Sequence, residues 1–239
     1  MANINKGIEI TYLGHSTFRL KSADGKLILV DPWVMNNPAC PDDLKEFDRI
    51  DIMTVTHAHF DHIGDAVELG KKHDPKVIGI YETCVWLNSK GVEKILPMNK
   101  GGTQNVDGIK FTMVHADHSC GIQDDDGKII YGGEAVGYVI EFENGFKIYH
   151  AGDTAVFSDM KLISEIYRPE LVMIPIGDLF TMSPLEAAHA CRFLNPQYVI
   201  PMHYATFPAL TGTPDQLRDL TKDKHEMQII ALKPGEILT

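Results

Sequence analysis

The chain has 239 residues, of which 44% are hydrophobic and 23% are charged, and its formal net charge is −11. This composition is ordinary for a globular enzyme, and no apolar run approaches the roughly 20 residues of a membrane-spanning helix. The acidic balance disfavours an extended nucleic-acid-binding surface, because such surfaces are usually basic.

The four cysteines lie far apart in the chain and include no Cys-x-x-Cys pair. Neither a disulfide framework nor a thiolate zinc site is therefore indicated. The first residues lack the basic and apolar regions of a signal peptide, so we expect a cytoplasmic protein without a membrane partner. No low-complexity segment or linker divides the chain, and we interpret residues 1–239 as one domain.

Strands are predicted where apolar and polar residues alternate, or where a short apolar run lies between turn signals. In the first half of the chain they cover residues 7–12, 17–21, 26–30, 52–55, 76–81, 93–96, 104–106 and 109–114. In the second half they cover residues 138–142, 146–150, 171–176, 198–200, 227–232 and 236–238. Asp24-Gly25, Asp107-Gly108 and Asn144-Gly145 are turn signals that predict hairpins between neighbouring strands.

Helices are predicted between these strands, and two of them have clear end signals. They cover residues 64–73, 82–90, 156–167, 184–194 and 214–222. Gly91 is a C-terminal stop, and Ser183 is an N-cap that Pro184 follows at the first helical position. The proline-containing segment 35–48 is loop-like and is expected to line or cover a cavity. Because β-rich sequence passes into β/α sequence twice, the chain predicts two similar halves packed sheet to sheet with helices outside.

Residues 56–65 contain the densest group of metal-binding side chains. His57, His59, Asp61 and His62 directly follow the predicted strand at 52–55. Three imidazoles and a carboxylate so close together suit neither a core nor a plain surface loop, but they suit a turn that wraps a cation. Junctions between a strand, a loop and a helix are also where α/β proteins usually build sites.

Four further polar residues follow other predicted strands. Asp31, His118, Asp153 and His203 each come just past the end of a β segment, so all of them could converge on one rim of a sheet core. Each also has a purely structural interpretation: Asp153 suits a turn, and a lone His203 suits a hydrogen-bonded core position. The cluster at 57–62 could likewise be hydrogen-bonded histidines without a metal.

Taken together, these residues resemble the metallo-β-lactamase superfamily. The seven positions that carry the resemblance are His57, His59, Asp61, His62, His118, Asp153 and His203. Within the superfamily, the chain is similar to the branch of uncharacterised metal-dependent hydrolases related to L-ascorbate-6-phosphate lactonase. The likeness extends over nearly the whole chain through residues 14–16, 31–32, the region of Asp178, and residues 203–208.

The resemblance implies class α/β, with an αββα sandwich of two mixed sheets, helices on the outer faces and two metal ions at one edge. The ligands that it implies are His57, His59 and His118 for the first metal, Asp61, His62 and His203 for the second, and Asp153 as the bridge. His118 is preferred to its rival His115 because it lies beyond the strand, as the family pattern has it. Nitrogen and oxygen ligands without thiolate suit zinc, with manganese, iron or nickel as alternatives.

Such a site implies hydrolysis. Two cations about 3.5–4 Å apart share a water, and metal binding lowers the pKa of that water to about 7. One metal then polarises a carbonyl or phosphoryl oxygen while the other stabilises charge on the leaving side. Asp61 is the expected catalytic residue, because it could orient the water or pass on its proton. Asp31 is expected to fix a histidine tautomer, and His15 and Tyr204 are expected to face the substrate.

The function expected from the sequence is therefore that of a metal-dependent hydrolase acting on a small ester, lactone or phosphoester, with a small molecule as its partner. One alternative is a ribonuclease or other nucleic-acid phosphodiesterase of the same superfamily. The segment between Asp153 and His203 is too short for the large inserted domain of RNA-cleaving relatives, so no nucleic-acid partner is expected. Another alternative is a non-enzymatic metal-binding protein. The sequence leaves a homo-oligomer open.

Overall fold

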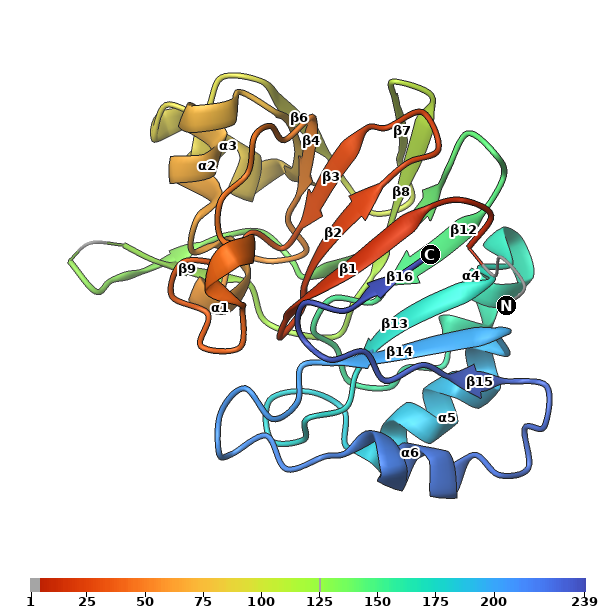
Figure 1. Cartoon of the computed structure of the whole chain (residues 1–239). Coiled ribbons are helices and arrows are strands. Elements are labelled where there is room, and N and C mark those ends of the chain that lie inside the picture. The colour runs from red at the N-terminus through yellow and green to blue at the C-terminus, as the bar shows by residue number, and fades with distance from the viewer. Residues whose placement is uncertain (1–4, 125) are drawn as a thin grey trace.

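Two seven-stranded sheets face each other in the computed structural model, which describes residues 5–124 and 126–239 (Figure 1). The first sheet has the order β16-β1-β2-β3-β4-β5-β6. Its strands are β1 (Glu9–Gly14), β2 (Thr17–Lys21), β3 (Leu27–Val30), β4 (Ile52–Thr54), β5 (Lys76–Ile80), β6 (Ile95–Met98) and β16 (Ile237–Leu238). The strands from β1 to β3 pair antiparallel, whereas those from β3 to β6 pair parallel.

The second sheet repeats this plan, with the order β15-β14-β13-β12-β11-β8-β7. Its strands are β7 (Thr103–Val106), β8 (Ile109–His115), β11 (Val136–Glu141), β12 (Lys147–His150), β13 (Leu171–Pro175), β14 (Tyr198–Met202) and β15 (Gln228–Ile229). The pairs from β7 to β12 are antiparallel, and those from β12 to β15 are parallel. As a result β8, β12, β13 and β14 all run in one direction and end at the same edge.

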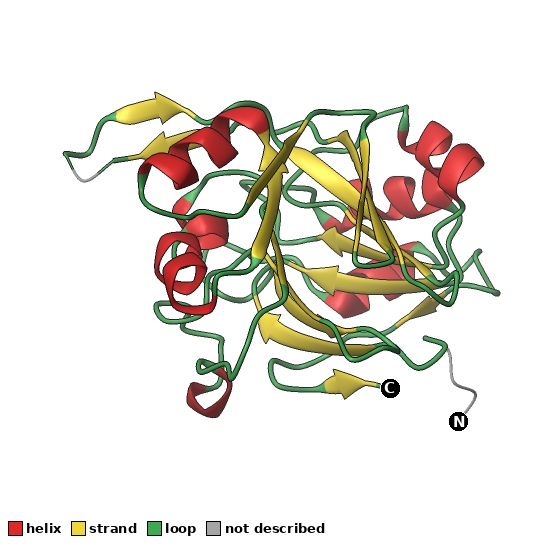
Figure 2. Ribbon diagram, turned by 90° about the horizontal axis from the view of Figure 1, so that it is seen from above, coloured by secondary structure: helices red, strands yellow, loops and turns green. Residues whose placement is uncertain are grey.

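Helices cover the two outer faces, as Figure 2 shows. They are α1 (Phe60–Ile63), α2 (Ala66–His73), α3 (Tyr81–Ser89), α4 (Met160–Tyr167), α5 (Pro184–Leu194) and α6 (Pro214–Leu220), with a 3₁₀ turn η1 (Asp42–Leu44). α2 and α3 pack on the first sheet, and α4 to α6 pack on the second. The expected αββα sandwich is therefore confirmed. Among the described residues, no helix combines the length and apolar character that crossing a membrane requires.

Alternation along the strands distributes the core over three layers. In β3, Ile28 and Val30 point into the core between the sheets, whereas Leu29 points to the layer under α2 and α3. Phe111 and Tyr138 of the second sheet fill the same central core. Burying each such side chain contributes about 1.5–3 kcal/mol, so this central layer holds the two sheets together.

Several predicted boundaries were wrong. The helix expected at 156–167 begins only at Met160, because the loop after Asp153 continues to that point. The strand expected at 198–200 continues to Met202. Pro201 is tolerated there because β15 pairs only with Tyr198 and Val199, so no ladder hydrogen bond on that side requires an N–H from residue 201. Residues 227–232 form a strand only at Gln228–Ile229.

Four short elements were not predicted at all: the 3₁₀ turn η1, which lies in the segment expected to be a loop, α1, β9 and β10. α1 is a single turn that follows His59 and contains Asp61 and His62. β9 (Gly121–Gln123) and β10 (Ile129–Tyr131) form a separate two-stranded hairpin that projects from the body of the molecule (Figure 1). The helix from Pro184 was predicted correctly, and its Ser183 forms a capping box with Glu186.

Candidate metal centre

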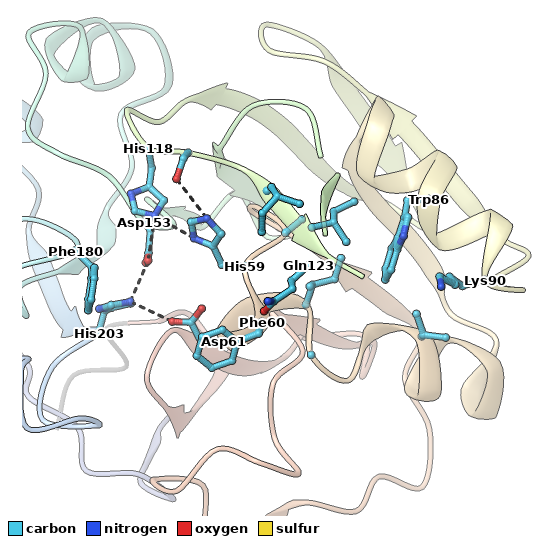
Figure 3. A pocket seen from close by; sticks show the side chains of 18 of the residues that line it. His59, Phe60, Asp61, Trp86, Lys90, His118, Gln123, Asp153, Phe180 and His203 are labelled. Carbon is cyan, nitrogen blue, oxygen red and sulfur yellow. Dashed lines mark hydrogen bonds and ion pairs between the residues drawn. The ribbon is translucent and has the colours of Figure 1, made fainter. Parts of the chain in front are cut away.

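The candidate metal ligands lie at one edge of the two sheets, on loops that leave both of them. His57 follows β4 of the first sheet, whereas His118, Asp153 and His203 follow β8, β12 and β14 of the second. Because those three strands end at the same edge, their loops meet above the loop that follows β4. Figure 3 shows His59, His118, Asp153, His203 and Asp61 facing a common space.

The backbone is strained at one candidate ligand and at two residues that lie beside the ligands. His15, Asp31 and His203 have φ values of 58°, 51° and 55°, in the left-handed region that non-glycine residues rarely adopt. Such a residue costs on the order of 1–3 kcal/mol and persists only where its surroundings hold it. Here the amide of His203 donates to the carbonyl of His15, and that of Asp31 donates to Thr54. Strain gathered in this way is typical of functional sites.

His57, His59 and His118 form the first group. Nε2 of His57 lies 3.0 Å from Nδ1 of His59, and Nε2 of His118 lies 3.3 Å from that same atom. Burial lowers the pKa of all three imidazoles below the ordinary value, so each is neutral and has a lone pair to offer at neutral pH. These separations are close to the edge of a tetrahedron built on metal–nitrogen bonds of about 2.0–2.1 Å.

Asp153 lies between this group and a second one. Its Oδ2 is 2.9 Å from Nε2 of His203 and 3.3 Å from Nε2 of His62. The same oxygen is 3.9 Å from Nε2 of His57 and 3.9 Å from Nε2 of His118. The Asp153 side chain is almost fully buried. One carboxylate oxygen is therefore within reach of both groups, which is the position that a bridging ligand needs.

Several of these buried atoms have no hydrogen-bond partner. They include Oδ1 of Asp153 and Nδ1 of His203, whereas Nε2 of His62 and Nε2 of His203 face the Asp153 carboxylate as ion pairs without hydrogen-bond geometry. Leaving a buried polar atom unpaired costs about 1–3 kcal/mol, and native proteins rarely leave several of them together. Because nitrogen and carboxylate oxygen are also suitable donors for divalent ions, the residues present fit a bound metal.

Protons occupy part of this site when no cation does. Burial opposes protonation of His203, but the Asp153 carboxylate outweighs it and raises the pKa of His203 to about 9. Burial also opposes the protonation of His62, whose pKa is nevertheless raised well above its usual value by Asp153 and Asp31. Both imidazoles are therefore charged at neutral pH. Metal binding must displace these protons, so the apparent affinity for a cation rises with pH.

Asp31 lies behind His62 and fixes its orientation. Nδ1 of His62 donates to Oδ2 of Asp31 at 2.7 Å, and the carboxylate also accepts hydrogen bonds from the backbone and the hydroxyl of Thr56. Asp31 is completely buried. With Nδ1 protonated toward Asp31, Nε2 of His62 is left to face Asp153.

His15 and Tyr204, which the sequence predicts to face the substrate, are not among the residues that line the cavity beside the candidate ligands. Tyr204 packs instead with the apolar cluster of the second sheet and its helices. His15 is completely buried, and its Nε2 lies 2.9 Å from Oδ2 of Asp61 while its Nδ1 lies 3.0 Å from Oγ1 of Thr206. Burial lowers the pKa of His15 to about 4, so the ring is neutral.

The contact between His15 and Asp61 was not predicted from the sequence. Its Nε2 and the ligand atoms of Asp61, His62 and His203 all lie within 4.8 Å of one another. The motif Gly14-His15-Ser16 was a signal for the site, but only the fold shows that the ring supports Asp61. His115, by contrast, is exposed and contacts Lys100 and Phe157, well apart from the groups above.

We expect His15→Ala to weaken divalent-cation binding by about 10–100-fold, since supporting residues around metal ligands typically have effects of that size. The physical reason is the loss of the group that orients Asp61. Competition with a chelating fluorophore measures the affinity, and circular dichroism checks the fold. Thr206→Val is the matched variant, and it should give a smaller effect in the same direction. Unchanged cation affinity in His15→Ala would show that His15 has only a packing role.

The chain is similar to known proteins over almost its whole length. Residues 9–203 match the profile of the Beta-lactamase superfamily domain. A UPF0173 metal-dependent hydrolase of Koribacter versatilis is 55% identical over 233 residues, covering 97% of each chain. Another, from Rubrobacter xylanophilus, is 49% identical over 97% of this chain and 96% of its own. The solved structure of Igni18, a metallo hydrolase from Ignicoccus hospitalis, is 35% identical with a TM-score of 0.84, covering 96% of this chain and 97% of that one.

Proposed function

Because the chain belongs to the UPF0173 metal-dependent hydrolases of the beta-lactamase superfamily, we propose that it uses two divalent cations to hydrolyse a small ester, lactone or phosphoester. The observation that carries the proposal is the position of Asp153, whose Oδ2 lies within 3.9 Å of four histidine nitrogens from two groups. A single cation would be coordinated by only one of these two groups of histidines, and the other group would have no cation to bind. Zinc suits the donor set best, with manganese, iron or nickel as alternatives.

We assign His57, His59 and His118 to the first cation and Asp61, His62 and His203 to the second, with Asp153 shared. Bound cations of this kind lower the pKa of water and polarise a carbonyl or phosphoryl oxygen. Neighbouring residues would fix the orientation of the ligand side chains. Asp31 fixes the ring of His62, and His15 fixes the carboxylate of Asp61.

Asp61 is suited to orienting the attacking water. Burial would raise the pKa of its carboxyl group, but the hydrogen bond from His15 and the nearby imidazole of His203 hold that pKa well below the usual range. A carboxylate with so low a pKa is ionised at neutral pH and binds a proton only weakly. Because Asp61 also lines the cavity, it can accept a hydrogen bond from a water there and fix its direction.

Asp61→Ala tests this function. We expect the wild-type protein, loaded with zinc or manganese, to hydrolyse at least one compound among p-nitrophenyl acetate, a γ-lactone and bis-p-nitrophenyl phosphate. Dipicolinate should abolish this turnover, and added metal should restore it. Asp61→Ala should lower kcat/KM on the order of 100-fold or more, since it removes both an orienting group and a ligand.

The matched control is Glu68→Ala, which removes an exposed carboxylate from α2, close by in the chain. It should keep wild-type activity, and both variants should keep the wild-type circular dichroism spectrum. Metal-loaded wild-type protein that turns over no member of these three substrate classes would count against a hydrolase of this kind. Full activity of Asp61→Ala would refute the role of that residue.

A further inference from the structure

We infer that the substrate carries an extended apolar arm next to the bond that is cleaved, and that this arm lies between α2, α3 and the β9–β10 hairpin. The inference rests on the proposed function, because it names the class of substrate for that same site: carboxylic esters of medium-chain acids. Water adds to the ester carbonyl carbon, the bond to the alcohol oxygen breaks, and the carboxylic acid and the alcohol leave.

The first step is the shape of the cavity. A single cavity of about 900 Å³ contains the metal-side residues His59, His118 and His203 and continues to Trp86 and Lys90. Figure 3 shows Trp86 on α3 and Lys90 just past its end, across the cavity from His203. Sites of about 300–1,000 Å³ enclose drug-sized ligands. A compound as small as a simple lactone would occupy only the end beside the metal ligands.

The second step is the chemistry of the wall beyond that end. The apolar lining residues are Ile63 of α1, Val67 of α2, Trp86 of α3, Ile122 of β9 and Ile129 of β10. A wall of this composition binds methylene or aromatic groups, because each buried methylene contributes about 0.8 kcal/mol, or about a fourfold gain in binding.

The third step is exposure. Ile129 is 71% exposed, and Phe60 and Phe180, which line the metal end, are 62% and 61% exposed. Large apolar side chains gathered around one cavity are typical of a binding surface. An acyl chain that runs from the metal centre toward Trp86 would remove these side chains from water. The ester group at the other end of the same substrate would then lie beside the metal ligands.

The fourth step is charge. Of the lining residues that the structure describes, only Lys90 has a permanent positive charge, and its Nζ lies 5.5 Å from the ring centroid of Trp86. Beyond the candidate ligands, Ser119 and Gln123 are the polar uncharged side chains of the lining. They would pair with only some of the hydroxyl groups of a phosphorylated sugar lactone, and the remaining hydroxyl groups would face isoleucine, valine and tryptophan without partners, which is costly. An apolar chain avoids that cost.

The test is a chain-length series with metal-loaded protein. We expect kcat/KM for p-nitrophenyl esters to rise from acetate through butanoate to octanoate, by about twofold to fourfold per methylene. In Trp86→Ala and in Ile129→Ser, the octanoate-to-acetate ratio of kcat/KM should fall at least tenfold. Val85→Ala is the matched control, because Val85 is the exposed neighbour of Trp86 on α3 and does not line the cavity. Its ratio should equal that of the wild type.

A binding measurement separates this inference from the proposed function. Isothermal titration calorimetry with decanoate, on protein treated with chelator, measures binding to the apolar part of the cavity (the arm site) in the absence of catalysis. Trp86→Ala should weaken this binding at least tenfold. If decanoate binds in this way but no ester is hydrolysed, the arm site stands and the hydrolytic function fails. If esters are hydrolysed with no dependence on chain length, or if a phosphorylated sugar lactone is preferred to every ester, the function stands and the apolar arm is refuted.

Discussion

Asp153→Ala will purify with fewer divalent cations per chain than the wild type, and its kcat/KM will fall on the order of 1,000-fold or more. The substitution removes the carboxylate whose Oδ2 lies 2.9 Å from His203 and 3.3 Å from His62. It also leaves buried imidazoles facing one another without an anion, which lowers their affinity for any cation. Elemental analysis of the purified protein and steady-state kinetics measure the two effects.

Asp117→Ala and Asp153→Asn complete that experiment. Asp117 is an exposed carboxylate immediately before His118, and its removal should change neither metal content nor rate. Asparagine at 153 keeps the shape of the side chain without its charge. If Asp153→Asn loses as much metal and kcat/KM as Asp153→Ala, the effect is due to the charge. Two cations per chain and a near-normal rate in Asp153→Ala would exclude a bridging position for this residue.

Gly177→Ala will lower kcat/KM by about 100-fold, even though residue 177 is not among the candidate ligands. A Cβ at this position would lie 2.0 Å from the carbonyl oxygen of His203. A backbone atom cannot rotate away, so the segment that delivers the His203 ring must shift. Displacing a catalytic group by about 1 Å can cost 100-fold in rate, and the overpacking should cost about 1–3 kcal/mol of stability.

Gly79→Ala is the control for Gly177→Ala. A Cβ there meets only the Sγ of Cys84, at 3.2 Å, and an atom of the Val55 backbone at 4.0 Å. We expect near-normal activity and metal content in that variant. Thermal melts, metal titrations and kinetics on both proteins separate a general loss of stability from a displaced ligand. Wild-type kinetics in Gly177→Ala would mean that the His203 segment moves freely, against the fixed geometry described above.

The sequence allowed the site to be predicted where unusual side-chain chemistry coincides with the end of a predicted strand. His57 to His62 could be recognised as a site because imidazoles and a carboxylate are costly anywhere else. His118, Asp153 and His203 could be added because each follows a strand, and the three strands run the same way in the sheet. Ser183 marked the start of α5 through a cap that depends only on local geometry.

The rest depended on contacts between distant parts of the chain. The direction of the His15 ring is set by a register shift between β1 and β2 and by a left-handed φ, neither of which a local pattern encodes. β10 has no alternation to detect, because Ile129, Ile130 and Tyr131 are all exposed. α1 is one turn long and is held by the loop in which it lies, so its sequence carries little periodic signal.

Because the candidate ligands come from loops of both sheets, bound cations would also link the two sheets and stabilise their packing. His57 and His62 belong to the first sheet's loops, and His118 and His203 belong to the second's. A bound ion therefore adds its binding free energy to the cohesion of the two halves, about 2.7 kcal/mol when the free ion stands at 100 times its dissociation constant. The protein without metal would therefore be less stable, and the rate at which a cell degrades it would rise when metal is scarce.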